Sequence, residues 1–462
     1  MILERDLLKF IKQNQGVIDM KEADVVIIGG SAAGIPAGIT ARRHYPDKSI
    51  ALIRKEERVL IPCGIPYIFG TVNKPENNLI PDKVLEANDI DLIIDEAVDI
   101  DRENKKVDLK SGEDVSYDKL VLATGANPIV PPIPGLDKKN VFSVVKDVDY
   151  MHSMIDSMED AKNVVILGGG FIGVEFADEC NKRGLNVTIV EMLPHCLMLA
   201  FVEDFCKDAE ARLEERGVNV VTNTKLEEVL GDEKVEKVKL SDGRELDADV
   251  VVVGIGVTPN TELGQKAGLE TNKGGLVVDN NMRTSDKDIF ACGDCTSKWS
   301  FFTGKPCDVN LASVATMESR IVGANLFGTK RENPGVVSAF STAIGDFTIA
   351  MAGLNERQAT ENGFEVAIGE AEKMNRHPGG MPGGHTMKVQ LVFNKKNQTL
   401  IGGQVRGGPS AGELVNVISA CIQKKMTADD IATFQMATHP AVTASPIAYQ
   451  LVNAAEMALK KM

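Results

Sequence analysis

The most regular feature of the chain is a short, wholly apolar run followed by closely spaced glycines and a helix-like stretch, and it occurs twice. The first copy spans residues 24–54 and ends in a second apolar run at 50–53. The second copy spans residues 163–191 and has its glycines in G-x-G-x-x-G register. Because this order places backbone N–H groups and the positive end of a helix against a pyrophosphate, it predicts two nucleotide-binding units. The positions expected at the phosphates are Gly29, Ser31 and Gly34 in the first copy and Gly168, Gly170 and Gly173 in the second.

The similarity between the two halves continues downstream. Residues 106–125 align without gaps to residues 237–256, and each segment shows a hairpin pattern, an aspartate (Asp118 or Asp249), an apolar strand and a final glycine. Shared internal order of this kind predicts two similar α/β domains. Further on, residues 385–408 alternate apolar and polar positions around a turn and lead into helical stretches.

Length and charge narrow the functional classes. A chain of 462 residues is too long for one core and suggests roughly three domains. The formal net charge of −15 argues against a nucleic-acid partner, which needs a concentrated basic face. No uninterrupted apolar stretch reaches the roughly 20 residues that span a bilayer, so we expect no membrane partner.

The start of the chain and the cysteine content concern the compartment. Residues 1–20 carry acids and no small-residue cleavage site, so they are not typical of a secretory signal and predict an amphipathic helix. The eight cysteines are scattered, and we expect most of them to be reduced and buried. These features favour the cytoplasm.

The residue after the second strand of each unit indicates which nucleotide is bound. In the second unit this residue is Glu191, whose carboxylate can accept both ribose hydroxyls and would repel a 2′-phosphate. NADH is therefore favoured over NADPH. In the first unit the same position is Arg54, so the expected ribose-binding acid is missing unless Glu56 reaches back.

Three further patterns carry candidate chemistry. Cys63 lies in the irregular run I-P-C-G-I-P, which is a poor helix interior and a poor central strand. Cys292 and Cys295 form a C-x-x-C, but no second such pair exists to complete a metal site, so packing is the better interpretation and we expect no metal. The glycine-rich run 376–385 has two histidines and predicts a loop near the substrate mouth.

The segment T-S-x-x-x-I-F-A-x-G-D at 284–294, together with the two glycine-rich units, resembles the FAD- and NAD-dependent pyridine nucleotide–disulfide oxidoreductases over about residues 23–460. In that family the first unit binds FAD and the second binds the nicotinamide dinucleotide. The resemblance implies FAD contacts at Gly29, Ser31, Gly34, Arg54, Ala97 (beside Glu96), Thr124, Gly125, Asp294, Leu311 and Ala312, with Asp294 on the ribitol and Leu311-Ala312 facing the isoalloxazine. It implies NAD contacts at Gly168, Gly170, Phe171, Gly173, Glu175 and Glu191, with Phe171 as an aromatic gate over the nicotinamide pocket.

The resemblance also implies an architecture. The fold expected is α/β, with two Rossmann-like nucleotide-binding domains and a C-terminal α+β domain that makes a homodimer. The expected division is a helical extension at 1–22, an FAD-binding domain at 23–133 and 262–338, an NAD-binding domain at 134–261, and a dimerisation domain at 339–462.

Cys63 places the chain within the family. Two-cysteine members have C-x-x-x-x-C here, whereas the fifth position after Cys63 is Ile68. The chain therefore resembles the single-cysteine branch, which contains coenzyme A disulfide reductases, NADH-dependent persulfide or polysulfide reductases, and NADH oxidases and peroxidases. Arg42 and Arg43 resemble the basic residues that hold coenzyme A phosphates in some of these relatives.

The Cys63 sulfur must be a thiolate to attack a disulfide. If residues 64–69 open a helix, its N-terminus contributes about 0.3–1 kcal/mol, which moves a thiol pKa by less than one unit. A second partner is therefore needed. By resemblance it is His439, which the neighbouring subunit would supply as acid and base, although Ala444 stands where two-cysteine members carry a glutamate.

Three functions remain open from the sequence. The favoured one is an NADH-dependent flavoenzyme that reduces a small disulfide, persulfide or polysulfide, such as coenzyme A disulfide, through Cys63. The nearest alternative is an NADH oxidase or peroxidase that cycles the same thiol through sulfenic acid. An alternative of another class is a non-catalytic FAD- and NADH-binding sensor or an electron-transfer subunit whose partner docks at the N-terminal helix.

Overall fold

The computed structural model describes residues 22–462. The helical extension expected at 1–22 therefore lies outside the described residues, apart from Glu22, which opens strand β1.

The first domain is built on a seven-stranded sheet with the order β5-β2-β1-β8-β7-β6, in which β21 also pairs with β8. Strands β2 and β21 and the final parts of β1 and β8 are buried, because both faces of the sheet are covered there, whereas the edge strand β5 is only partly buried. Helices α2 and α8 pack so closely beside this sheet that a Cβ at Gly323 would lie 2.5 Å from the carbonyl oxygen of Ala37. The elements are β1 (Glu22–Ile28), α2 (Gly34–His44), β2 (Ile50–Arg54), β3 (Val59–Leu60), β4 (Leu79–Ile80), α3 (Lys83–Glu86), β5 (Asp91–Ile94), β6 (Ala97–Asp101), β7 (Lys106–Leu109), β8 (Asp114–Leu122), α7 (Glu262–Lys266), β19 (Thr271–Asn272), β20 (Gly275–Leu276), β21 (Ile289–Ala291), β22 (Lys298–Trp299), β23 (Pro306–Cys307) and α8 (Ala312–Asn325).

The second domain has a five-stranded parallel sheet with the order β10-β17-β11-β12-β13. The repeat that the sequence predicted is present, with one difference. In the first domain β7 pairs with β8 of the main sheet, whereas β14, β15 and β16 form a separate three-stranded sheet. Strands β9 (Ala126–Pro128) and β18 (Val257–Pro259), which lead into and out of this domain, pair with each other. The other elements are β10 (Val141–Ser143), α4 (Val148–Glu159), β11 (Asn163–Leu167), α5 (Phe171–Lys182), β12 (Asn186–Val190), α6 (Glu203–Glu215), β13 (Asn219–Val221), β14 (Leu226–Leu230), β15 (Lys237–Leu240), β16 (Glu245–Asp247) and β17 (Val250–Val253).

The C-terminal domain is an antiparallel sheet with the order β24-β25-β28-β27-β26. Strands β27 and β28 are the alternating segment predicted at 385–408, and helices α10 and α12 pack against this sheet. Its elements are β24 (Ala339–Ile344), β25 (Phe347–Gly353), α9 (Glu356–Glu361), β26 (Val366–Met374), β27 (Thr386–Asn394), β28 (Leu400–Gly407), α10 (Ala411–Gln423), α11 (Ala428–Ala432), η4 (Pro446–Ala448) and α12 (Gln450–Leu459).

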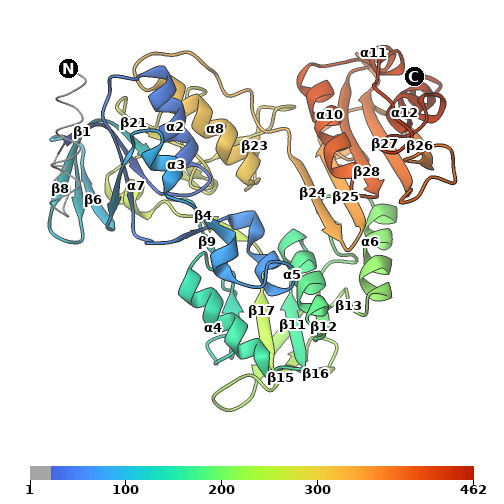
Figure 1. Cartoon of the computed structure of the whole chain (residues 1–462), viewed down its shortest axis with the longest axis horizontal. Helices are drawn as coiled ribbons and strands as arrows, with labels where there is room; N and C mark the ends of the chain where they lie inside the picture. The colour runs from blue at the N-terminus through green and yellow to red at the C-terminus, as the bar shows by residue number, and fades with distance from the viewer. Residues whose placement is uncertain (1–21) are drawn as a thin grey trace.

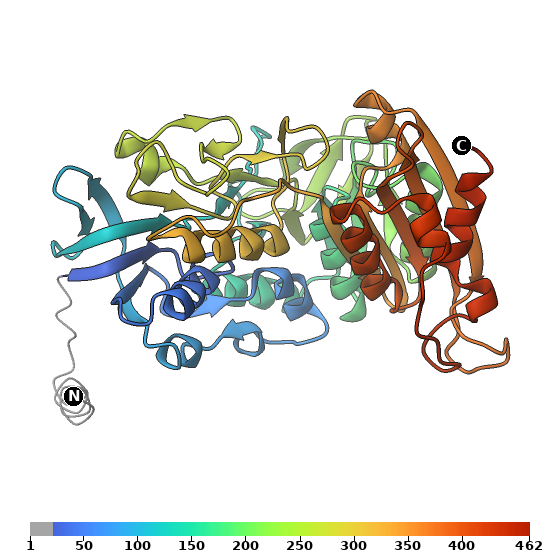
Figure 2. The same cartoon turned by 90° about the horizontal axis from the view of Figure 1, so that it is seen from above.

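The three domains form an elongated molecule. In Figure 1 the first domain and the C-terminal domain lie at opposite ends of the long axis, and the second domain lies below and between them. Figure 2 shows the C-terminal sheet and its helices stacked at one end. Helix α5 contacts both neighbours, since it packs against the short helix η2 (Pro66–Phe69) and against β24. Among the described residues, none of the helices has the length and apolar character needed to cross a membrane.

Arg42, in the last turn of α2, holds together two connections of the first domain. Its guanidinium donates to the carbonyl oxygens of Pro46 (3.0 Å), Lys48 (2.6 Å), Asn88 (3.0 Å) and Asp89 (2.6 Å). A side chain that donates hydrogen bonds to four backbone carbonyl groups has a structural role, because it links the segments that carry them. The geometry therefore does not favour Arg42 as a phosphate ligand.

We expect Arg42→Ala to lower the free energy of unfolding by about 2 kcal/mol, because it removes hydrogen bonds from a charged donor and leaves carbonyl groups without that partner. The neighbouring Arg43 is exposed, so Arg43→Ala is the matched control and should change stability by less than about 0.5 kcal/mol. Urea denaturation of both variants measures the difference. Equal effects would contradict the structural role.

Candidate active site

The first nucleotide-binding unit has the geometry of a pyrophosphate site. Gly29 follows β1 with a φ of +114°, and a Cβ at Gly34 would lie 1.8 Å from the carbonyl oxygen of Gly29. Ser31 lies in this turn, and its carbonyl oxygen accepts from the N–H of Ile35 at 3.3 Å. Helix α2 begins without a side-chain cap and without an acidic residue in its first turn, which suits an anion at its N-terminus.

The second unit repeats this arrangement with a carboxylate added. Gly168 has a φ of +106°, and a Cβ at Gly173 would lie 1.9 Å from the carbonyl oxygen of Gly168. Gly170 is the N-cap of α5, again without a side-chain cap. The carboxylate of Glu191 accepts from the N–H of Gly169 at 2.6 Å and from the N–H of Leu193 at 2.7 Å. These bonds fix the Glu191 carboxylate beside the glycine turn, where the sequence placed the ribose contact.

Arg54 lies at the end of β2, as the sequence predicted, but its guanidinium is already paired. The side chain is buried and makes two bonds to the carboxylate of Asp82, at 2.7 Å and 2.9 Å. It also donates to the carbonyl oxygens of Glu56 and Glu57. The structure thus gives Arg54 a structural role and favours no FAD contact through its charged group. Ala97, the other outlying position, opens β6.

A buried ion pair between Glu318 and Lys298 binds the Gly293–Asp294 turn through a hydrogen bond. Glu318, on α8, accepts from the N–H of Gly293 at 2.8 Å and lies 3.1 Å from the ammonium group of Lys298. Both charged side chains are almost fully buried. Asp294 itself is half-buried and lies near Lys146, with 4.0 Å between the Asp294 Oδ2 and Lys146 Nζ atoms. The aspartate predicted for the flavin ribitol is therefore available to a ligand.

Two further predicted FAD positions close the same region. The Thr124 hydroxyl donates to the carbonyl oxygen of Asn260 at 2.7 Å, and Gly125 follows with a φ of +72°. Leu311 is the N-cap of α8, and Ala312 is its first residue. Helix α8, like α2 and α5, has neither a side-chain cap nor an acidic first turn. Three long helices with bare N-termini give a chain of net charge −15 the means to hold anionic dinucleotides, so these residues fit FAD and NAD.

The geometry of the C-x-x-C pair indicates a packing role for both thiols. Cys292 and Cys295 are both buried and unbridged, and the Cys295 thiol donates to the carbonyl oxygens of Cys292 and Leu122. Among the described residues no cluster of histidine, cysteine or acidic side chains could hold a metal ion.

Cys63 lies in a short irregular segment of the first domain that reaches the second. The segment forms two 3₁₀ turns, η1 (Pro62–Gly64) and η2, each beginning with proline, rather than one helix over 64–69. The contribution of a helix dipole to the thiolate is therefore not supported. Of the eight cysteines Cys63 is the exposed one, since six are buried and Cys307 is intermediate.

The charges around Cys63 act mostly against its thiolate. Burial by neighbouring protein atoms raises the pKa of the thiol, as do the negative charges of Glu175 and Asp294, while the Lys146 ammonium lowers it. The structure thus brings together Cys63 from the first domain, Glu175 from the second domain and Asp294 from the segment 284–294, which returns to the first domain. These are three of the residues that the sequence proposed.

Glu175 and Phe171 lie one turn apart on α5, facing the C-terminal domain. The pKa of Glu175 is raised to about 7, chiefly by burial and also by the charge of Glu179, while a hydrogen bond from Thr342 (2.8 Å) opposes this rise. The ring of Phe171 packs edge-on against Phe340, with 4.9 Å between centroids. The predicted gate is therefore in contact with the C-terminal domain of its own chain.

His439 lies in the C-terminal domain, whereas Cys63 lies in the first domain. The histidine is exposed, in the segment between α11 and η4, and its N–H donates to the Thr443 hydroxyl at 2.9 Å. The loop at 376–385 packs beside it, with the N–H of His377 donating to the carbonyl oxygen of Pro440 at 3.2 Å. The role of His439 at the Cys63 of a partner subunit stays a prediction from the family resemblance.

Sequence reasoning missed three side chains of this region: Lys146 and Tyr67, which interact with the charge of Cys63, and Thr342, which binds Glu175. Burial raises the pKa of Tyr67 to about 12, and the charges of Glu175 and Glu179 raise it too, which places its phenol in the same acidic neighbourhood. Tyr67 follows Cys63 by four residues and could have been noticed. Lys146 and Thr342 come from distant segments, and no local pattern marks them.

Comparisons with known proteins agree with this geometry. Residues 23–319 match the model of the pyridine nucleotide-disulphide oxidoreductases, and residues 339–447 match the dimerisation domain of the same family. An NADH oxidase of Methanocaldococcus jannaschii is 33% identical over 448 residues, which cover 95% of this chain and 99% of that protein.

Two sulfur reductases are also similar. The NAD(P)H coenzyme A polysulfide/persulfide reductase of Pyrococcus horikoshii is 32% identical over 395 residues, which cover 83% of this chain and 87% of that protein. The solved structure of a NAD-dependent persulfide reductase from A. fulgidus superposes with a TM-score of 0.88 at 33% identity, over 95% of this chain and 83% of that chain.

These findings confirm the expected fold class and the use of FAD and a nicotinamide dinucleotide. The chain belongs to the pyridine nucleotide-disulphide oxidoreductase family and is an FAD-dependent oxidoreductase with a C-terminal dimerisation domain.

Proposed function

We propose that this protein is an NADH-dependent reductase of a small disulfide, persulfide or polysulfide, such as coenzyme A disulfide, and that Cys63 is its redox-active thiol. The observation that carries the proposal is the position of Cys63. It is the exposed thiol of the chain, and it lies among the charges of Asp294, at the predicted flavin site, and Glu175, at the predicted nicotinamide site. A thiol there can reach a substrate from solvent.

FAD, held by the turns at Gly29 and Asp294, would accept a hydride from NADH and pass the electron pair on. The chain's own residues handle the sulfur chemistry. The Cys63 thiolate attacks one sulfur of the substrate, forms a mixed disulfide and releases the other half as a thiolate. Two electrons then cleave the mixed disulfide, which frees the second thiolate and restores Cys63.

The thiolate needs support beyond its own surroundings, since burial, Glu175 and Asp294 all oppose it. Lys146 is the cation that opposes them within the chain. In a homodimer His439 of the partner subunit would add an imidazolium that stabilises the thiolate and protonates the leaving thiol. The match of residues 339–447 to the dimerisation domain supports this arrangement.

Coenzyme A recognition, if the substrate carries it, would fall to Arg43 rather than Arg42, because Arg43 is exposed and Arg42 is committed to carbonyl groups. The named activities of the Pyrococcus relatives support coenzyme A or persulfide as the substrate class. The eight unbridged cysteines suit a reducing compartment such as the cytoplasm.

A second candidate is an NADH oxidase or peroxidase in which Cys63 cycles through sulfenic acid. The 33% identity to the NADH oxidase of M. jannaschii favours it specifically. The non-catalytic sensor gains no support, because the family match identifies an oxidoreductase and the proposed docking helix lies outside the described residues.

Replacing the thiol separates these functions. We expect Cys63→Ser to lower NADH-dependent reduction of coenzyme A disulfide and polysulfide by more than about 100-fold, because the nucleophile is lost, and to leave the first reduction of the flavin by NADH intact. Steady-state assays with disulfide, polysulfide, oxygen and peroxide give the acceptor. Cys421→Ser, at a buried thiol in α10, is the control. Unchanged turnover in Cys63→Ser would mean direct transfer from the flavin.

The nucleotide preference depends on the charge of Glu191. We expect Glu191→Gln to raise the KM for NADH about 10-fold and to narrow the preference over NADPH, because a neutral amide binds the ribose less strongly and repels a 2′-phosphate less. Glu203→Gln changes an exposed acid of the same domain and should have no effect. An unaltered KM ratio in Glu191→Gln would contradict the assignment.

The proposed role of His439 is tested by measuring disulfide reduction separately from flavin reduction by NADH. We expect His439→Ala to slow disulfide reduction about 100-fold, as loss of a general acid does, while flavin reduction by NADH keeps its rate. His385→Ala provides the matched control from the neighbouring loop. Native disulfide turnover in His439→Ala would remove this residue from the site.

A further inference from the structure

Helix α5 meets the C-terminal domain of the same chain through a matched pair of faces. Phe171 and Glu175 are four residues apart and share one face of the helix. Phe340 and Thr342 are two residues apart and share one face of β24, an edge strand of the C-terminal sheet. The Phe171 and Phe340 rings pack at 4.9 Å, and the Thr342 hydroxyl donates to Glu175 Oε1 at 2.8 Å. Both residues of the nicotinamide site therefore have a partner on this strand.

We propose that Thr342 and Phe340 are positioning residues for hydride transfer, holding the Glu175 carboxyl and the Phe171 ring in place at the nicotinamide site of their own chain. The proposal rests on the function assigned to that site. It gives the C-terminal domain a second task, because the same domain would also supply His439 to the partner subunit's site.

The hydroxyl of Thr342 matters because Glu175 has little else to hold its charge. The groups facing Glu175 are Glu179 on its own helix, Cys63 and Tyr67 from η1 and η2, and Thr342 from β24. The ammonium group of Lys182 forms ion pairs with Asp178 and Glu179. The pKa of Glu175 is raised to about 7, chiefly by burial and also by the charge of Glu179, and the Thr342 hydrogen bond is the influence that opposes this rise. This one bond favours the carboxylate and also fixes where it points.

Strand β24 is itself held firmly, so its side chains can position others. The ladder pairs Phe340 with Met351 on β25, and the row continues across the sheet through Gln404 and Gln390 to Glu370. The Gln404 and Gln390 amides form a chain of hydrogen bonds of 2.7 Å that ends on Glu370.

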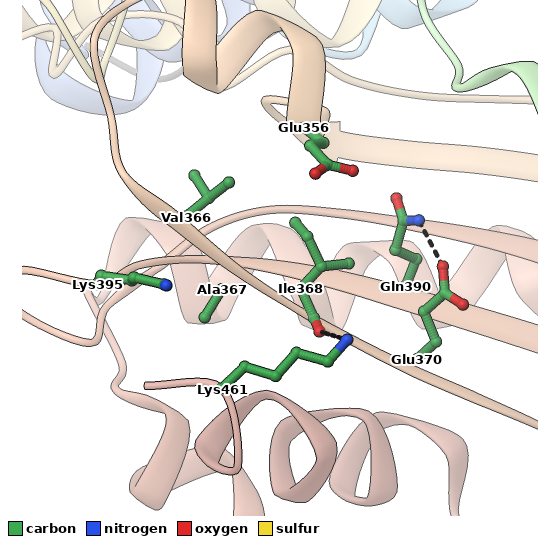
Figure 3. A pocket seen from close by; sticks show the side chains of 8 residues that line it. All are labelled: Glu356, Val366, Ala367, Ile368, Glu370, Gln390, Lys395 and Lys461. Atoms are coloured by element: carbon green, nitrogen blue, oxygen red, sulfur yellow. Dashed lines mark hydrogen bonds between the residues drawn. The ribbon is translucent and has the colours of Figure 1, made fainter.

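The outer end of this row is visible in Figure 3, where Gln390 donates to Glu370 at the edge of a polar cavity of about 410 Å³. At the inner end Gln404 accepts from the N–H of Val202, just before α6. The Gln404 and Gln390 amides thus link this face of the sheet into one hydrogen-bond network, which helps to hold its side chains in place.

The test compares Thr342→Val, which keeps the shape and removes the hydroxyl, with Thr342→Ser, which keeps the hydroxyl. Thr348→Val is the matched control, since it alters a buried threonine of β25 whose side chain lies on the other face of the sheet. Flavin reduction by NADH is followed by stopped flow from pH 6 to pH 9, within about a unit or two of the Glu175 pKa near 7.

We expect Thr342→Val to slow flavin reduction about 10-fold, as the loss of a hydrogen bond to a charged group does. In the plot of this rate against pH, the fall at low pH should move to higher pH in Thr342→Val, because loss of the hydrogen bond raises the pKa of the Glu175 carboxyl. Thr342→Ser should stay near native, and Phe340→Leu should slow the step without moving the fall at low pH. Native rates and an unshifted fall at low pH in Thr342→Val, or an equal loss in Thr348→Val, would overturn the proposal.

A second readout does not depend on turnover. The Glu175 charge raises the pKa of Cys63, so a Glu175 that stays neutral to higher pH leaves Cys63 more reactive. Alkylation of Cys63 by iodoacetamide near neutral pH should therefore be faster in Thr342→Val and in Glu175→Gln than in Thr342→Ser. Flavin reduction involves no disulfide, so full disulfide turnover in Cys63→Ser would defeat the proposed function and leave this result standing.

Discussion

The candidate active site depends on the contact between η2 of the first domain and α5 of the second. The Phe69 and Phe176 rings, both fully buried, pack with 5.1 Å between centroids. Gly70 fits so tightly that a Cβ there would lie 2.4 Å from the carbonyl oxygen of Glu179. The buried Glu179 carboxylate accepts from the Thr71 hydroxyl at 3.0 Å and pairs with Lys182, which offsets the cost of burying its charge. This contact brings Cys63 and Glu175, from separate domains, into one site.

The charges of the molecule are used in two opposite ways. Three bare helix N-termini provide positive potential for anionic cofactors without lysine or arginine, which suits a chain of net charge −15. Around the thiol the arrangement is reversed, since Glu175 and Asp294 favour the neutral Cys63 and Lys146 alone among the named influences favours its charge through Coulomb attraction. The proposed imidazolium of His439 from a partner subunit would add a second positive charge beside Lys146.

The features that the sequence predicted well are local in the chain. The glycine turns at Gly29 and Gly168 and the Gly293–Asp294 turn follow from short motifs, because neighbouring residues alone determine a turn and a helix start. The family resemblance supplied the roles of Cys63 and Glu175, which no spacing rule connects.

The features that it could not predict depend on long-range packing. Thr342 is 167 residues from Glu175, so only the folded chain reveals their hydrogen bond. Arg42 and Arg54 look like ligand-binding cations in the sequence. In the structure Arg42 donates to backbone carbonyl oxygens, and Arg54 forms an ion pair with Asp82.

The order of strands in the first sheet has a consequence for synthesis. Strand β21 (Ile289–Ala291) completes that sheet against β8, after the whole second domain has been made. During synthesis on a ribosome, the second domain, continuous from β10 to β17, can therefore form its own sheet before β21 exists to pair with β8. Nascent chains halted between these points would carry a finished insert within an unfinished host.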